Sequence, residues 1–144
     1  MKIYIGADHA GFKLKEELKM FLQDLGYDIE DVGAYKLDEN DDYPDFIIPT
    51  AKFVAKNFGS LGIVIGGSGQ GEAIAANRAR GIRAAVVYDK YSAIMSREHN
   101  NANIISLGAR VLSVRKAKKI VKLWIETSFS NEERHIRRIK KIDQ

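Results

Sequence analysis

Residues 60–72, SLGIVIGGSGQGE, decide the fold, because an apolar run passes directly into a glycine-rich turn. The run SLGIVIG has the length and the apolar side chains of a strand that is buried on both faces. A short helix is expected to follow over about 70–79. A buried strand that turns through glycines into a helix is the repeating unit of parallel α/β sheets, so this stretch predicts an α/β fold.

The same alternation of apolar runs and amphipathic stretches extends along the whole chain. Further strands are expected at 2–6, 27–33, 82–88 and 103–107, and further helices at about 11–25, 45–57, 90–98, 114–126 and 131–141. This order predicts an open, five-stranded parallel sheet covered by helices on both faces, with an extra helix at the C-terminal end. Ligands bind such sheets at the carboxyl ends of the strands. No repeat or linker interrupts the pattern, so one domain over residues 1–144 is expected.

The composition excludes several classes of protein. The 144 residues are 45% hydrophobic and 29% charged, as in ordinary globular proteins. No apolar run approaches the roughly 20 residues of a membrane span. Asp8 and His9 interrupt the N-terminal apolar stretch too early for a signal peptide, so a cytoplasmic location without membrane contact is expected. The absence of cysteine excludes disulfides, thiolate metal sites and a cysteine base.

The net charge of +4 is concentrated near the C-terminal end. From residue 114 onward the chain has ten basic and four acidic residues. This excess favours an anionic partner, either a phosphorylated small molecule or a nucleic acid. The alternative is an ordinary solvated helix face.

The glycine-rich turn is suited to holding an anion. The segment 66–71, GGSGQG, lets the backbone approach a ligand closely and directs N–H groups toward an oxyanion or a phosphate. No Lys-Ser/Thr pair follows, as a P-loop requires, and no acidic residue is placed for a ribose contact, so nucleotide binding is not favoured. Glu72 falls in the first turn of the expected helix, where a buried and ionised carboxylate is a competent base. The alternative is a capping or helix-dipole role for Glu72, together with Ser68.

Other polar side chains are expected near the same sheet edge. Asp8 and His9 follow the first strand, where they either bind substrate or cap the next helix. His99 precedes the fifth strand, and its alternative is a satisfied core histidine. We expect these groups to converge on one edge of the sheet with three arginines that are suited to a phosphate: Arg110, Arg134 and Arg138.

Several segments resemble the ribose-5-phosphate isomerase B family, which includes galactose-6-phosphate isomerase subunits. They are GADHAG at 6–11, DDYPDF at 41–46, GIVIGGSGQGEAIAANR at 62–78, GIRAAVV at 81–87, SREHNNAN at 96–103, LGAR at 107–110 and RHIRR at 134–138. The resemblance implies a Rossmann-like three-layer αβα sandwich and a homodimer, or a dimer of dimers, with shared active sites. It also implies reversible conversion of ribose 5-phosphate to ribulose 5-phosphate through an enediol(ate), as in the non-oxidative pentose phosphate pathway, with no metal or other cofactor.

One position departs from the common family pattern. Many members have cysteine as the base where this chain has Gly66, whereas a subgroup with GGSG-x-GE uses the glutamate. The resemblance therefore implies that Glu72 is the base, that His99 opens the sugar ring with help from Asp8, and that Ser68 moves a proton between oxygens. The implied substrate-binding residues are His9, Tyr43, Gly67, Gly69, Gly71, Asn100, Arg110, Arg134 and Arg138, with the last two reaching into the neighbouring subunit's site.

Three alternatives remain open at this point. The substrate could be a six-carbon aldose phosphate, such as allose 6-phosphate or galactose 6-phosphate. The basic C-terminal end could belong to a nucleotide- or nucleic-acid-binding module, although no aromatic residues are interleaved with its charges, so no nucleic-acid partner is expected. A catalytically silent relative is disfavoured, because Asp8, Ser68, Glu72 and His99 are all present.

Overall fold

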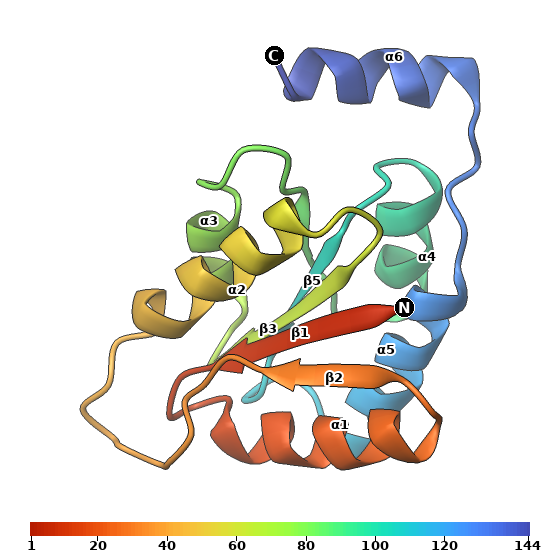
Figure 1. Ribbon diagram of the computed structural model, residues 1–144. Helices are drawn as coiled ribbons and strands as arrows, with labels where there is room; N and C mark the ends of the chain where they lie inside the picture. The colour runs from red at the N-terminus through yellow and green to blue at the C-terminus, as the bar shows by residue number, and fades with distance from the viewer.

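The computed structural model describes residues 1–144, in which strands and helices alternate along the chain (Figure 1). The strands are β1 (Lys2–Ala7), β2 (Asp28–Asp31), β3 (Leu61–Gly66), β4 (Ala84–Val86) and β5 (Ile104–Gly108). The helices are α1 (Phe12–Asp24), α2 (Pro44–Lys56), α3 (Gln70–Ala76), α4 (Lys90–Glu98), α5 (Val114–Glu126) and α6 (Glu133–Ile142). All expected elements are present, but β2 and β4 are shorter than predicted. Both are edge strands, which pair on one side only.

All neighbouring strands of the sheet are parallel, in the order β2-β1-β3-β5-β4. The chain leaves β1 toward one edge to form β2, and then returns past β1 to form β3. The switch point therefore lies between β1 and β3, where Ala7 is in register with Ile65. In open α/β sheets this crevice, at the carboxyl ends of the strands, is where ligands bind. The segments after β1 and β3 are thus the natural walls of a site.

The helices form a layer on each face of the sheet, which confirms the three-layer αβα sandwich (Figure 1). One core lies between the sheet and helices α1 and α5, and it contains Leu18, Val121 and the fully buried Trp124. The Trp124 indole N–H donates to Ser96 Oγ at 3.1 Å, which satisfies its only polar group. A smaller core lies under α2 and α3 on the opposite face. Apolar burial on both faces fixes the strands that carry the site.

Helix α6 lies apart from these layers, at the top of the view in Figure 1. The extended segment before it is attached to α4, where Ser130 N–H donates to Glu98 O at 3.1 Å. Near the end of α6, Asp143 forms an ion pair with Arg83 at 2.8 Å. No helix or strand of its own chain packs extensively on α6. None of the six helices combines the length and apolar character that crossing a bilayer requires.

Candidate active site

The glycine-rich loop follows β3 and is held tightly against β5. Gly69 has a φ of +83°, a conformation that favours glycine, and its carbonyl accepts a hydrogen bond of 2.6 Å from the buried Ser106 Oγ. A Cβ on Gly108 would lie 2.7 Å from the Ser68 carbonyl oxygen, so the two segments fit only with glycine there. The N–H groups of Gly67 and Ser68 donate to no other group of the chain. The loop is therefore rigid and keeps free N–H donors at the switch point.

Glu72 is buried in the first turn of α3, with only 4% of the residue exposed. Its carboxylate lies directly over the Cα of Gly66, since a Cβ built there would overlap Oε1 and Cδ and would lie 2.8 Å from Oε2. Burial raises the pKa of Glu72, and the nearby Asp8 charge adds to the increase, while the backbone N–H groups of Glu72 and Gly69 oppose it. A desolvated carboxylate with a raised pKa is a stronger base than an exposed one.

The capping interpretation of Glu72 is correct in part. Gly69 is the N-cap of α3 and offers no side chain, so a full capping box is absent. Glu72 nevertheless occupies the third helical position, from which its carboxylate interacts with the Gly69 N–H. Ser68 Oγ accepts a hydrogen bond of 3.2 Å from the Gln70 N–H. The Glu72 carboxylate thus lies close to both the start of α3 and Gly66, and the Ser68 hydroxyl hydrogen is left available.

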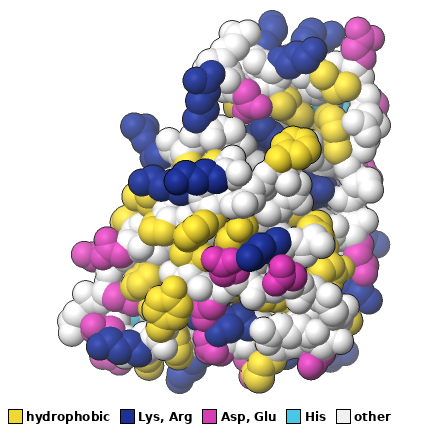
Figure 2. Space-filling model, in the orientation of Figure 1, with side chains coloured by type: hydrophobic (Ala, Val, Ile, Leu, Met, Phe, Trp, Pro, Cys, Tyr) yellow, Lys and Arg dark blue, Asp and Glu magenta, His cyan; other side chains and the backbone are white.

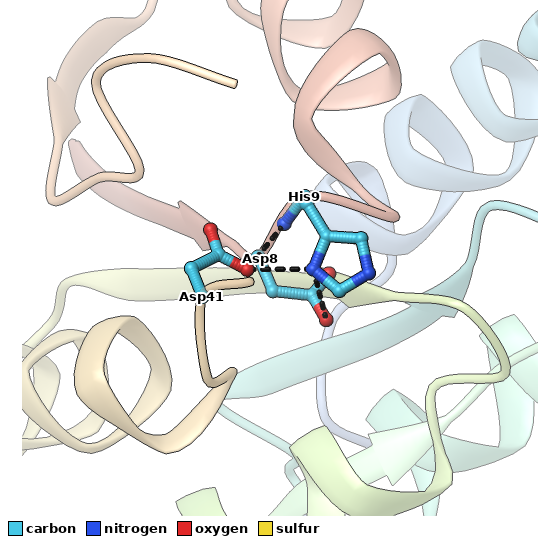
Figure 3. A group of neighbouring side chains, drawn as sticks. All are labelled: Asp8, His9 and Asp41. Atoms are coloured by element: carbon cyan, nitrogen blue, oxygen red, sulfur yellow. Dashed lines mark hydrogen bonds and ion pairs between the residues drawn. The ribbon is translucent and has the colours of Figure 1, made fainter. Parts of the chain in front are cut away.

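Asp8 and His9 follow β1 and are joined by Asp41 from the loop before α2 (Figure 3). Asp41 Oδ1 accepts hydrogen bonds from the His9 backbone N–H at 2.9 Å and from the ring Nδ1 at 2.6 Å. The buried Asp8 approaches the same ring nitrogen, with Oδ2 3.9 Å from Nδ1, and its Oδ1 accepts from the Gly11 N–H at 3.1 Å. The Asp41 hydrogen bond raises the pKa of His9, helped by Asp8 and opposed by burial and Arg110. The helix-cap interpretation of Asp8 is wrong, because the N-cap of α1 is Gly11 and no side chain caps that helix. The Asp8 carboxylate instead closes the turn before α1 and faces Glu72 and His9.

Asp8, His9 and Asp41 are also the one group of side chains whose ligand atoms lie close enough to hold a metal, within 4.8 Å of one another. The 2.6 Å between His9 Nδ1 and Asp41 Oδ1 is, however, the length of a hydrogen bond to a charged acceptor. A metal bound between these atoms would have to displace the proton that joins them. The geometry is that of an imidazole held by a carboxylate.

Tyr43 and Arg110 complete the site within one chain. A Cβ on Gly71 would lie 2.8 Å from Tyr43 Cζ, so the ring rests on the glycine loop. The guanidinium of the exposed Arg110 lies over Gly67, with Nη1 3.0 Å from the place that a Cβ would occupy. The structure therefore brings together the predicted residues Asp8, His9, Tyr43, Gly67, Ser68, Gly69, Gly71, Glu72 and Arg110.

Four predicted residues lie elsewhere in the chain, so the expected convergence on one sheet edge is wrong within a single subunit. His99 ends α4, before β5 begins, and its ring stacks on that of His135 in α6 with centroids 4.3 Å apart. The glycine loop follows the carboxyl end of β3. Because β5 is parallel to β3, the start of β5 lies at the opposite, amino end of the strands, roughly 15 Å away. Asn100 lines a cavity of about 480 Å³ with Arg83 and Ile142 at this amino end. The exposed Arg134 and Arg138 belong to α6 and lie on this side as well.

Two residues near these groups were not selected from the sequence. Asp41 begins the DDYPDF motif at 41–46, but no pattern in the sequence links it to His9, which lies 32 positions away along the chain. His135 lies one residue from Arg134. It is buried, with its ring stacked on that of His99, and this burial is the main cause of its lowered pKa. Neither the burial nor the stacking could be predicted from the sequence.

The fold and the site define a class of protein: a doubly wound α/β protein with a buried carboxylate beside a glycine loop that has free N–H groups, at the switch point of the sheet. The chain belongs to the Ribose/Galactose Isomerase family, whose family model matches residues 3–142. The family resemblance deduced from the motifs is thereby confirmed.

Individual relatives match almost the whole chain. It is 45% identical over 139 residues to ribose-5-phosphate isomerase B of Mycobacterium tuberculosis, which covers 96% of this chain and 86% of that protein. The structure of Clostridium thermocellum ribose-5-phosphate isomerase B superposes with a TM-score of 0.95 at 47% identity, covering 99% of this chain and 95% of that one. The structure of the Mycoplasma genitalium enzyme with bound ribulose 5-phosphate also gives a TM-score of 0.95, at 38% identity over 99% of this chain and 93% of that one.

Proposed function

We propose that this protein interconverts ribose 5-phosphate and ribulose 5-phosphate through an enediolate, with Glu72 as the base. The observation that carries the proposal is the buried Glu72 carboxylate held over Gly66 beside a glycine loop with free N–H groups. The names of the relatives, and the ribulose 5-phosphate bound to one of them, favour the five-carbon substrate over allose 6-phosphate or galactose 6-phosphate.

In the proposed reaction, Glu72 removes the proton from C2 of the open-chain aldose. The electron pair of that C–H bond forms the C1–C2 double bond, and the carbonyl π electrons move to O1. The protonated Glu72 then returns the proton to C1, while the proton on O2 moves to O1 and the C2 carbonyl forms. One carboxylate serves both steps because C1 and C2 are adjacent. Burial raises the pKa of Glu72 above that of a glutamate in water, and a higher pKa makes the carboxylate a stronger base for this proton transfer.

Charge develops on O1 during this transfer, and the glycine loop faces it. The free N–H groups of Gly67 and Ser68 would donate to the enediolate oxygen, and donors of this kind typically lower a barrier by about 3 kcal/mol. The Ser68 hydroxyl accepts from the Gln70 N–H, so its own proton is free to pass between O1 and O2. Gly69 and Gly71 let the loop pack closely against β5 and Tyr43, because a Cβ on either would lie against Leu107 or the Tyr43 ring.

Ring opening and phosphate binding would require a second subunit. Within one chain, the glycine loop lacks the imidazole of His99 and the guanidinium groups of Arg134 and Arg138. Basic side chains gather over α6 at the top of Figure 2, and no helix or strand of the same chain covers that helix extensively. We infer a homodimer in which each α6 and each α4 end approach the partner's glycine loop. His99 and Asn100 of one subunit would then face the sugar, and both arginines would join His9 and Arg110 of the other at the phosphate.

Complementation between inactive variants tests this shared site. Glu72→Gln and His99→Asn should each be inactive alone, because each damages every site of a homodimer. After unfolding and refolding as an equal mixture, half the dimers are mixed, and one of the two sites in each is intact. Activity should return to about a quarter of the wild-type value. A mixture that stays inactive while forming mixed dimers would place all catalytic groups in one chain.

A coupled assay tests the substrate. Ketose formation is measured from ribose 5-phosphate, allose 6-phosphate and galactose 6-phosphate, with Glu72→Gln as the inactive reference and the exposed Glu126→Gln as the matched control. The proposal expects the highest kcat/KM for ribose 5-phosphate and wild-type activity in the control. A preference for either six-carbon sugar would support the alternative substrate.

A further inference from the structure

We propose that Asp41 is a positioning residue, which holds the His9 imidazole in place and keeps it charged so that its second ring nitrogen donates to the substrate phosphate. This inference rests on the proposed function, because it assigns the phosphate to His9. Asp41 would not itself contact the substrate. Its two hydrogen bonds to His9 are the only side-chain hydrogen bonds between the 35–42 loop and the segment after β1.

The geometry fixes both the orientation and the tautomer of His9. A single oxygen, Asp41 Oδ1, accepts from the backbone N–H and from the ring of the same residue, at 2.9 and 2.6 Å. A carboxylate only accepts, so Nδ1 carries a proton. In Figure 3 the other ring nitrogen, Nε2, faces away from Asp41 and Asp8. This nitrogen is thus free to donate to an anion.

Burial makes the interaction strong. The Asp41 side chain is 9% exposed, and its second oxygen, Oδ2, is buried without a hydrogen-bond partner. Figure 3 shows Oδ2 turned away from the imidazole, so the contact with His9 is the main compensation for burying this charge. Two carboxylates, Asp8 and Asp41, face the imidazole and favour its charged form, whereas Arg110 is the facing cation that opposes it.

The arrangement keeps His9 charged and at the same time leaves its Nε2 open to the phosphate. A phosphate dianion needs a cationic donor, but a histidine of ordinary pKa near 6.5 is mostly neutral at physiological pH. Asp41 supplies the negative charge from behind the ring, on the side away from Nε2. It therefore favours the imidazolium without standing between it and the phosphate.

The first test is an NMR titration of the histidine side chains, of which the chain has three. The His9 signals are assigned by their loss in His9→Gln. Asp41→Asn keeps an oxygen that accepts from the His9 N–H but removes the charge, and the neighbouring exposed Asp42→Asn is the matched control. The midpoint of His9 should fall by about one pH unit or more in Asp41→Asn and stay unchanged in the control. An unchanged His9 midpoint in folded Asp41→Asn would overturn the proposal.

The second test asks whether the effect reaches the substrate through His9. At about pH 8, Asp41→Asn should raise KM for ribose 5-phosphate roughly tenfold with little change in kcat. The same substitution in a His9→Gln background should add nothing, and Asp41→Glu should restore much of the affinity. An equal effect in the His9→Gln background, or a loss confined to kcat, would show that Asp41 has a different role.

Inorganic phosphate separates this proposal from the proposed function. Its binding, followed by the shift of the His9 signals, requires no turnover. Weaker phosphate binding in Asp41→Asn than in Asp42→Asn supports the positioning role even for a protein inactive on ribose 5-phosphate. Equal phosphate binding in the two variants contradicts it.

Discussion

Replacing Gly66 with alanine should displace the Glu72 carboxylate, the proposed base, while leaving Glu72 in the sequence. A Cβ at position 66 would overlap Glu72 Oε1 and Cδ, and the farther oxygen, Oε2, would lie 2.8 Å away. Ordinary van der Waals contact begins at 3.4 Å. Even Oε2 is 0.6 Å inside that distance, and the nearer atoms must move farther, on the order of 1 Å. A misplacement of this size typically costs about 100-fold in rate.

The assay measures kcat and KM for ribose 5-phosphate together with the thermal unfolding midpoint. Gly66→Ala should lower kcat by about 100-fold, and overpacking should destabilise the protein by about 1–3 kcal/mol. Gly59→Ala is the matched control, because Gly59 lies before β3 at the opposite end of the strand and has open space around it. Its φ of +83° makes alanine cost about 1 kcal/mol there, so this variant loses stability without losing kcat.

Combining the changes isolates the cause. If Gly66→Ala acts by moving Glu72, the double variant Gly66→Ala/Glu72→Ala should have the same residual kcat as Glu72→Ala alone, since the two changes disable one group. A Gly66→Ala protein with wild-type kcat would refute the reasoning, because the carboxylate would then not need its observed position. The same steric conflict explains why a cysteine at position 66 and this placement of Glu72 exclude each other.

Further predictions concern pH, charge and stability. The acidic limb of kcat/KM should lie at higher pH than the ordinary glutamate value of about 4.3, because the base must be ionised and burial raises the pKa of Glu72; a limb at or below that value would contradict the assignment. Arg110→Ala should raise KM for ribose 5-phosphate at least tenfold and reduce inhibition by inorganic phosphate, as inhibition kinetics would show. Asp31→Asn should destabilise the fold by about 3 kcal/mol in urea unfolding, because the fully buried Lys15 ammonium loses its 2.7 Å ion pair; a change below 1 kcal/mol would show that the remaining Glu16 contact suffices.

The layered fold could be predicted from the sequence because burial on both faces of a parallel sheet leaves a strong pattern. The run at 60–66 became β3 with all of Leu61–Gly66 buried, and the glycines after it mark the site. The strand order could not be predicted, since the placement of β5 between β3 and β4 depends on packing between distant segments. The shortening of β2 and β4 likewise follows from their edge positions.

Residues that follow strands were the predictable part of the site. Asp8, the glycine loop and Arg110 follow β1, β3 and β5, so parallel pairing alone brings them together. His99 precedes β5, which should have excluded it from the same edge within one chain. The role of Asp41 could not be identified, because its pairing with His9 depends on the path of a loop that has no periodic sequence pattern.

The most direct test of Glu72 as the proton-transferring base is turnover of ribose 5-phosphate in deuterium oxide by wild type and Glu72→Gln. Gln has the size of Glu but cannot accept the proton, so fold and phosphate affinity should be retained. Because the proton held by Glu72 can exchange with solvent while the enediolate lasts, the wild-type protein is expected to place solvent deuterium on C1 of the ketose. Glu72→Gln is expected to lose both turnover and deuterium incorporation by about 100-fold or more. Wild-type turnover and exchange in the folded Glu72→Gln protein would contradict the account.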